Sequence, residues 1–167
     1  ATRIDMKLVK QGDENYFGKN KVALLHFEFT TLCNQNCSYC LDGNADPNKE
    51  KAPPSDKKAM LQSIDKIFRA VGENDHLGFI LVGGEPTVQL AFPAVLSKIL
   101  SRENTNVLLT TNLRKPVEYY NNLDIPIIAS MNFDSVDPTA FLDKVIKLTN
   151  MIEHVRIMAH PQKTDIV

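Results

Sequence analysis

Patterns typical of β-strands alternate with patterns typical of amphipathic helices along most of this 167-residue sequence. Runs of aliphatic, aromatic and β-branched residues predict five strands, at 22–30, 77–82, 106–112, 125–132 and 154–161. Strands that are joined by helices run parallel within one sheet, so the alternation predicts an α/β fold. Five strands are too few for a closed eight-stranded barrel. We therefore expect an open, partial TIM-like barrel with its helices on the outside.

Helical spacing of apolar residues predicts four helices between these strands, at about 56–71, 93–100, 117–121 and 138–152. Ser55 is the expected N-cap of the first helix, and Asp137, followed by Pro138, is that of the fourth. The residues that the fourth helix is expected to bury are Phe141, Leu142, Val145, Ile146 and Ile152.

Residues 22–167 are expected to form a single core, preceded by an N-terminal segment, residues 1–21. In that segment Ile4, Met6 and Leu8 alternate with polar residues, as in an edge strand. The formal net charge is −1, without the basic excess that nucleic-acid binding usually requires. No apolar run approaches the roughly 20 residues of a membrane span. We expect neither nucleic acid nor a membrane as a partner.

All three cysteines, Cys33, Cys37 and Cys40, lie in the stretch CNQNCSYC. They are too few and too close for a disulfide framework, so we expect reduced thiols and a cytoplasmic location. One interpretation is a zinc site, completed by His26 or His160, although zinc modules usually take ligands from two separated knuckles. Another is three unrelated buried thiols. The third is a [4Fe–4S] cluster, in which three thiolates leave one iron open for catalysis.

The cysteine stretch resembles the CxxxCxxC motif of the radical S-adenosylmethionine (SAM) superfamily, with Tyr39 in its aromatic position. GGEP (Gly83–Pro86), after the second predicted strand, is similar to the second signature of that family. The resemblance covers about 22–161. It implies a partial barrel of six strand–helix units that binds a [4Fe–4S] cluster and SAM. The sixth unit is not evident, so either the barrel is truncated or the N-terminal segment or a partner completes it.

The resemblance also implies a role for individual residues. The cysteines would bind the cluster, and Tyr39 would lie against adenine or pack within the loop. Gly83 and Gly84 would allow close backbone approach to SAM, and Glu85 would pair with its ammonium group. A turn that simply requires glycine is the structural alternative.

Polar residues at the carboxyl ends of the later strands are further candidates, because ligands bind at this edge of parallel sheets. The expected ribose or substrate contacts are Thr110, Asn112, Ser130 and Asn132. Arg156 would bind the carboxylate of SAM or, equally, form a salt bridge with Glu28. His26, Glu28 and His160 are substrate candidates, although a satisfied core position is the commoner fate of such a histidine.

The sequence therefore predicts a radical SAM enzyme, an oxidoreductase in which reduction of the cluster cleaves SAM to a 5′-deoxyadenosyl radical that abstracts hydrogen. A peptide or protein side chain is the preferred substrate, because an incompletely walled barrel suits a large one. The alternatives are a glycyl-radical enzyme activase, a small-molecule or cofactor-biosynthesis enzyme, and a non-catalytic iron–sulfur or zinc protein. A flavodoxin- or ferredoxin-type electron donor is the expected partner.

Overall fold

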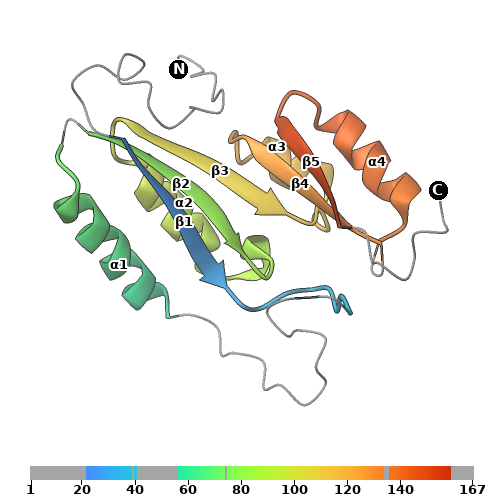
Figure 1. Ribbon diagram of the computed structural model, residues 1–167, viewed down its shortest axis with the longest axis horizontal. Coiled ribbons are helices and arrows are strands. Elements are labelled where there is room, and N and C mark those ends of the chain that lie inside the picture. Colours follow the sequence, from blue (N-terminus) through green and yellow to red (C-terminus); the bar gives the residue numbers. More distant parts are fainter. Residues whose placement is uncertain (1–21, 39, 41–55, 74, 134–135, 159–167) are drawn as a thin grey trace.

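The structure is a computed structural model, and it describes residues 22–38, 40, 56–73, 75–133 and 136–158. Its described strands form one sheet in the order β1-β2-β3-β4-β5, with every neighbouring pair parallel (Figure 1). The strands are β1 (Val22–Thr30), β2 (His76–Gly83), β3 (Thr105–Thr111), β4 (Ile127–Asn132) and β5 (Ile152–Met158). The predicted open, parallel α/β architecture is confirmed. The predicted N-terminal edge strand lies outside the described residues.

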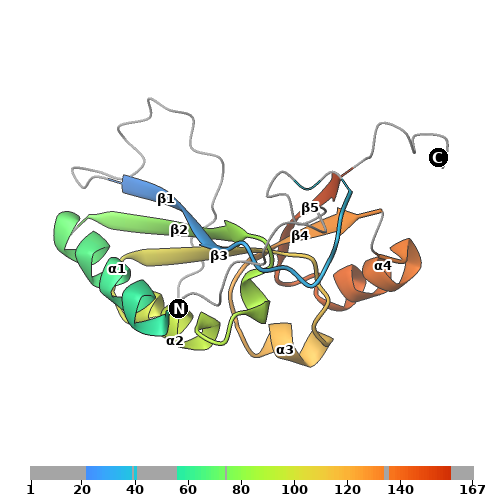
Figure 2. The same cartoon turned by 90° about the horizontal axis from the view of Figure 1, so that it is seen from below.

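The helices cover one face of this sheet, as Figure 2 shows from the side, and the described elements leave the other face open. They are α1 (Lys57–Ala70), the short 3-10 helix η1 (Pro86–Val88), α2 (Phe92–Leu100), α3 (Val117–Asn121) and α4 (Pro138–Lys147). One-sided coverage is what a run of same-handed crossovers between adjacent parallel strands produces. All carboxyl ends of the strands consequently meet at one edge of the sheet, beside the cysteine loop.

Two helices show how local sequence determines their first residues. Asp56, rather than the predicted Ser55, caps α1, and its side chain accepts a hydrogen bond from the backbone N–H of Lys58. The predicted cap of α4 is confirmed, because Asp137 accepts from the backbone N–H of Thr139 while Pro138 opens the helix. Both caps satisfy N–H groups that a first helical turn leaves unpaired.

Apolar residues pack between the sheet and the helices in two clusters. The first lies between β1–β3 and helices α1 and α2, and includes Ile64, Phe79, Leu81, Phe92 and Ile99. The second lies beneath β4 and includes Leu113, Tyr120, Ile127, Phe141 and Leu148. The two clusters hold the strands in register and so position the residues at their carboxyl ends.

Helix α4 differs from its prediction at three residues. Leu142 and Ile146 are 50% and 72% exposed, because Phe141 and Leu148 turn the opposite side of this segment into the core. Ile152 is the first residue of β5 rather than part of the helix. Helical spacing alone could not show that the helix ends at Lys147.

Strand β1 has the two faces that its alternation predicts. Leu25 and Phe27 pack against the first core cluster. Leu24, His26 and Glu28 are exposed on the open face of the sheet. That face carries the polar residues expected there, although they are exposed to solvent in the described part of the chain.

Candidate functional site

The cysteine loop leaves the carboxyl end of β1 and crosses toward β3 and β4. Cys37 is buried, Cys33 and Cys40 are partly buried, and all three are free thiols. The backbone N–H of Gln35 donates to Cys33 Sγ at 3.4 Å, and that of Cys40 donates to the Cys37 carbonyl at 3.1 Å. These local bonds fold the loop between Cys33 and Cys40.

The GGEP segment packs directly against the backbone that leads to the cysteines. Gly84 N donates to the Thr30 carbonyl at 2.6 Å, and Glu85 N donates to the Leu32 carbonyl at 2.8 Å. A Cβ on Gly83 or Gly84 would overlap those same carbonyl groups, and Gly83 has a φ of +121°. Both glycines are thus required by close contact between two backbone segments, which is the structural alternative considered for them. Their predicted contact with SAM stays a prediction.

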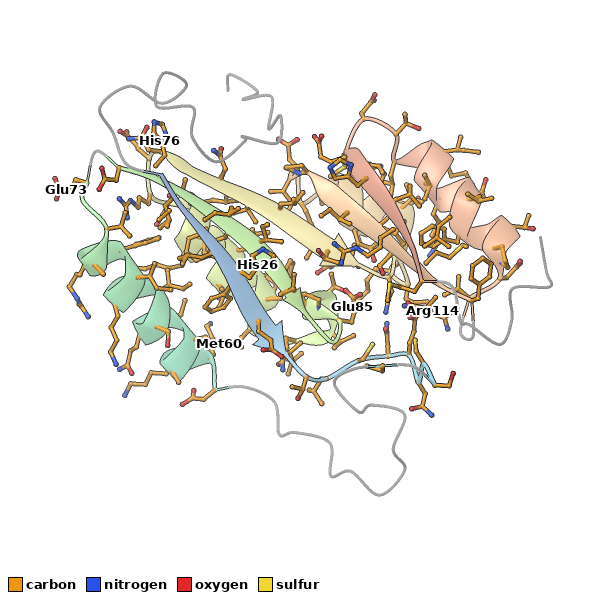
Figure 3. All side chains as sticks on the ribbon, viewed as in Figure 1. His26, Met60, Glu73, His76, Glu85 and Arg114 are labelled. Atoms are coloured by element: carbon orange, nitrogen blue, oxygen red, sulfur yellow. The ribbon has the colours of Figure 1, made fainter. Side chains whose placement is uncertain are left out.

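The Glu85 carboxylate connects the start of η1 to the end of β3, and Figure 3 shows it near the carboxyl ends of the strands. Its Oε1 accepts from the backbone N–H and the hydroxyl of Thr87, at 3.1 and 2.6 Å. Oε1 also accepts from the Thr111 hydroxyl at 2.9 Å, while Oε2 accepts from Asn112 N at 2.8 Å. Glu85 is only 1% exposed, and no described Lys, Arg or His forms an ion pair with it. Oε2 retains capacity for a further donor.

Side-chain amides connect the cysteine loop to the ends of β3 and β4. Asn112 Nδ2 donates to Asn34 Oδ1 at 2.8 Å and lies 3.9 Å from Cys33 Sγ. Asn132 Nδ2 donates to Gln35 Oε1 at 2.8 Å. The two asparagines, predicted as ribose or substrate contacts, therefore contact the loop itself in this structure.

The surroundings of Cys33 favour its neutral thiol. Burial raises the pKa of the Cys33 thiol, and the negative charges of Glu85, Cys37 and Cys40 raise it further. The hydrogen bond from the Gln35 backbone acts in the opposite direction. A metal that binds the three thiols must displace their protons.

The other predicted site residues are more dispersed. Ser130 and Arg156 are paired across β4 and β5, with Arg156 exposed. The predicted Arg156–Glu28 salt bridge is wrong. The two residues lie on β5 and β1, the two outermost strands, which three other strands separate. His26 lies midway along β1, away from the cysteine loop (Figure 3). Tyr39 and His160 lie outside the described residues.

Several residues of this edge were missed by sequence reasoning. They are Thr30, Gln35, Thr87, Gln89 and Thr111, all buried polar residues. Gln89 Nε2, for example, donates to Thr30 Oγ1 at 2.7 Å. Their common signal is a hydrogen-bonding side chain within or beside an apolar run, where burial without a partner would be costly.

The donor set fits an iron–sulfur cluster better than a single ion. Among the described residues, no three His, Cys, Asp or Glu side chains converge closely enough to hold one metal ion. This disfavours zinc with His26 as the fourth ligand, since zinc requires its ligands around one point. Each cysteine of a [4Fe–4S] cluster binds a different iron, so the sulfurs surround a larger group. Gln35 Nε2, in the cysteine loop, and Thr110 Oγ1, near the end of β3, are buried polar atoms without a hydrogen-bond partner among the described residues.

An open parallel α/β sheet with a cysteine triad and a buried polar network at its carboxyl edge defines a class of cofactor-dependent α/β enzymes. The family model for the radical SAM superfamily matches residues 27–159. The chain belongs to the radical SAM superfamily, and it is an enzyme of that family. The predicted family is therefore confirmed.

The chain is also similar to curated relatives of known name. It is 35% identical over 124 residues to the GTP 3′,8-cyclase of Mannheimia succiniciproducens, covering 70% of this chain and 34% of the relative. It is 30% identical over 131 residues to the GTP 3′,8-cyclase of Haemophilus ducreyi, covering 74% of this chain and 36% of the relative. The chain thus spans about a third of the length of these relatives.

Solved structures show the same fold at low sequence identity. A structure of anSMEcpe with bound AdoMet aligns with a TM-score of 0.60 at 15% identity, covering 81% of this chain and 42% of that one. A structure of BtrN in an open conformation aligns with a TM-score of 0.51 at 14% identity, covering 83% and 58%. The cofactors of the family are a [4Fe–4S] cluster and SAM, and its members need an electron donor. Within the described residues, no helix is both long and apolar enough to cross a membrane.

Proposed function

We propose that this chain cleaves SAM reductively, with Cys33, Cys37 and Cys40 as the ligands of a [4Fe–4S] cluster. The observation that carries the proposal is a loop with three reduced cysteines at the carboxyl end of β1, bonded through its backbone to the segment of a fully buried carboxylate, Glu85, that lacks a cationic partner among the described residues. When bound, the cluster supplies an electron that breaks a sulfonium C–S bond of SAM and yields the 5′-deoxyadenosyl radical. The chain supplies the ligands and the binding groups.

Glu85 is the residue we assign to the ammonium group of SAM. A buried carboxylate is costly without a compensating cation, and the free capacity of Oε2 offers a position for one. Its bonds to Thr87, Thr111 and Asn112 keep the carboxylate in place before the ligand arrives. Preorganised acceptors of this kind lose little entropy on binding. Thr110 and Ser130 face the open side of the same edge and are the proposed contacts for the rest of SAM.

The substrate we propose is a small nucleotide, with GTP as the first compound to test. This part rests on the curated relatives, which are named GTP 3′,8-cyclase. It favours the cofactor-biosynthesis alternative over the peptide or protein side chain preferred from the sequence, for which the comparisons give no support. A flavodoxin- or ferredoxin-type protein remains the proposed electron donor.

Anaerobic reconstitution with iron and sulfide, followed by dithionite and SAM, tests the proposal. We expect 5′-deoxyadenosine from the wild-type chain, and neither cluster absorbance nor product from Cys37→Ala. Ser38→Ala, in the same loop, is the matched control and should keep both. A colourless protein that holds one zinc, or a Cys37→Ala variant with full iron content, would show the ligand assignment to be wrong. More 5′-deoxyadenosine in the presence of GTP than of ATP supports GTP as the substrate. Equal amounts argue against it.

A further inference from the structure

Two side-chain amides contact a cysteine sulfur: Gln35 Oε1 accepts from Cys37 Sγ at 3.7 Å, whereas Asn112 is placed to donate to Cys33 Sγ from outside the loop. The side chain of Asn112 is 5% exposed and sits directly after β3. The Nδ2 atom lies 2.8 Å from Asn34 Oδ1 and 3.9 Å from Cys33 Sγ. The amide has two N–H bonds, so it can donate to both acceptors at once.

The orientation of this amide follows from its other contacts. Asn112 Oδ1 accepts from the backbone N–H of Arg114 at 3.2 Å, and the Asn112 backbone N–H donates to Glu85 Oε2 at 2.8 Å. Because a backbone N–H can only donate, the oxygen of the amide must face Arg114. The nitrogen therefore faces Asn34 and Cys33.

We propose that Asn112 is a positioning residue that donates an N–H to the sulfur of Cys33 and thereby raises the reduction potential of the bound cluster. The inference rests on the proposed function, in which Cys33 is a cluster ligand. Hydrogen bonds to ligand sulfurs are one of the factors that set the potential of an iron–sulfur cluster. An added electron increases the negative charge on the sulfurs, so a donor at that position stabilises the reduced state most.

A redox titration of the reconstituted cluster without SAM, monitored by electron paramagnetic resonance, measures its reduction potential directly. We expect Asn112→Leu, which has a similar volume but no donor, to lower the ratio of reduced to oxidised cluster about threefold to tenfold at the wild-type midpoint. For a one-electron couple this is a shift of about 30 to 59 mV to lower potential. Asn106→Leu, a change on the same strand away from the loop, is the matched control and should leave the potential unchanged.

Asn112→Asp separates hydrogen-bond donation from a purely structural role. An aspartate still accepts from the Arg114 backbone N–H, but it has no N–H to donate and adds a negative charge. Because the added charge alone lowers the potential, an Asp variant at or above the wild-type potential would show that Asn112 does not act as a donor to the sulfur. If it donates to Cys33, that variant has a potential as low as that of Asn112→Leu, or lower. Restoration of the wild-type potential by Asp overturns the proposal.

A substitution at an exposed position of the loop tests the proposal even if the Asn112 variants fail to bind the cluster. Asn34 is exposed, and Asn34→Ala leaves Cys33 as the remaining acceptor for Asn112 Nδ2. We expect its potential to equal or exceed that of the wild type. A potential lowered as in Asn112→Leu would mean that Asn112 acts through Asn34 rather than on the sulfur, and would overturn the proposal.

Failure of this inference can be told apart from failure of the proposed function. A wild-type chain that takes up no iron and sulfide contradicts the proposed function itself. A wild-type chain that cleaves SAM, together with an Asn112→Leu variant that has full iron content and an unshifted potential, contradicts only the role of Asn112.

Discussion

At each end of the sheet, a charged side chain forms hydrogen bonds with backbone groups, but the two networks differ in what they connect. At the carboxyl end, Glu85 is 1% exposed and accepts four hydrogen bonds from three residues. At the amino end, Arg102 donates to the carbonyls of Gly72 and Asp75, at 2.6 and 3.4 Å, and its guanidinium lies over the Phe68 ring. Neither forms an ion pair within the part of the chain that the structure describes.

The difference lies in what each network connects. The bonds of Arg102 hold the turn after α2 to the turn after α1, beside the amino end of β2. The carboxyl-end network extends from the cysteine loop across to β4, and the bond between Asn132 and Gln35 joins residues 97 positions apart. In parallel α/β sheets the carboxyl edge binds ligands, while the opposite edge mainly contributes stability. The polar network of this chain follows that division.

Glycine substitutions are expected to give the largest difference between the two ends in the loss of unfolding free energy. Gly84→Ala places a Cβ into the backbone of Leu32, which has no room to move, and should destabilise the chain by about 4 kcal/mol or more. Gly72→Ala, at the amino end, meets only the carboxylate of Asp75, a side chain that can turn away. It should cost about 1 kcal/mol or less. Urea unfolding of the cluster-free chain measures both, and equal losses would contradict the asymmetry.

Neutralising the buried carboxylate should have the next largest effect. In Glu85→Gln one carboxylate oxygen becomes an NH₂ group, which cannot accept a hydrogen bond. It then faces either the backbone N–H of Asn112 or the donors from Thr87 and Thr111. We expect a loss of about 2–3 kcal/mol in the free energy of unfolding. Glu103→Gln, at an exposed position near Arg102, is the control and should be neutral. A Glu85→Gln variant as stable as that control would show that the network contributes little.

Alkaline pH should lower the free energy of unfolding through Tyr120. Its hydroxyl lies 3.3 Å from Thr111 Oγ1, at the carboxyl end of the sheet. Burial raises the pKa of Tyr120 to about 12, from an ordinary value of 10. The folded state therefore favours the neutral phenol, and its stabilisation is complete below pH 10 and lost as the pH rises toward 12. The expected loss is about 2 kcal/mol by pH 11.5.

Tyr120→Phe provides the control for this pH dependence, since the variant has no phenol at that position. Unfolding free energies measured from pH 9 to 11.5 should fall less steeply for the variant than for the wild type. An identical slope for both would mean that Tyr120 does not ionise in this range on unfolding. The raised pKa of Tyr119 leaves a smaller residual slope in both proteins.

The smallest effect is expected at the amino end. Arg102→Leu removes hydrogen bonds to two carbonyls and the contact with Phe68. We expect a loss of about 1 kcal/mol in unfolding free energy, because the side chain is partly exposed to water. Iron content after reconstitution should stay at the wild-type level. A loss of iron in Arg102→Leu would show that the two ends are coupled and that the distinction between them fails.

Local sequence was sufficient for most of the fold. The predicted bounds of β1 and α3 agree with the structure, because each is a short apolar pattern with polar or turn-forming residues on both sides. The predictions failed where one residue satisfied two patterns. Ile152 fits the helical spacing of α4, yet it begins β5. The Arg156–Glu28 alternative failed because strand order is a property of the whole sheet.

The candidate site was predictable only in part, for the same reason. Glu85 and Asn112 were found because they lie in a motif or at the end of an apolar strand. Their partners Thr87 and Thr111 and the loop residue Gln35 carry no comparable local signal. Thr87 bonds to Glu85 only two residues away. The roles of Thr111 and Gln35 depend on bonds across 26 and 97 residues, and a single sequence does not reveal which distant side chains meet.

The backbone bonds from Gly84 to Thr30 and from Glu85 to Leu32 have a consequence for protein engineering. They set a fixed offset between the end of β2 and the first cysteine. Inserting one residue between Thr30 and Cys33 would shift the sulfur by roughly 3.3 Å, the rise of one extended residue. Anyone who transplants this pocket into another parallel sheet must therefore move both segments as a matched pair. The intervening helix α1, by contrast, makes no bond to this pair of segments within the described residues, so its replacement need only preserve the buried apolar positions of Met60 and Ile64.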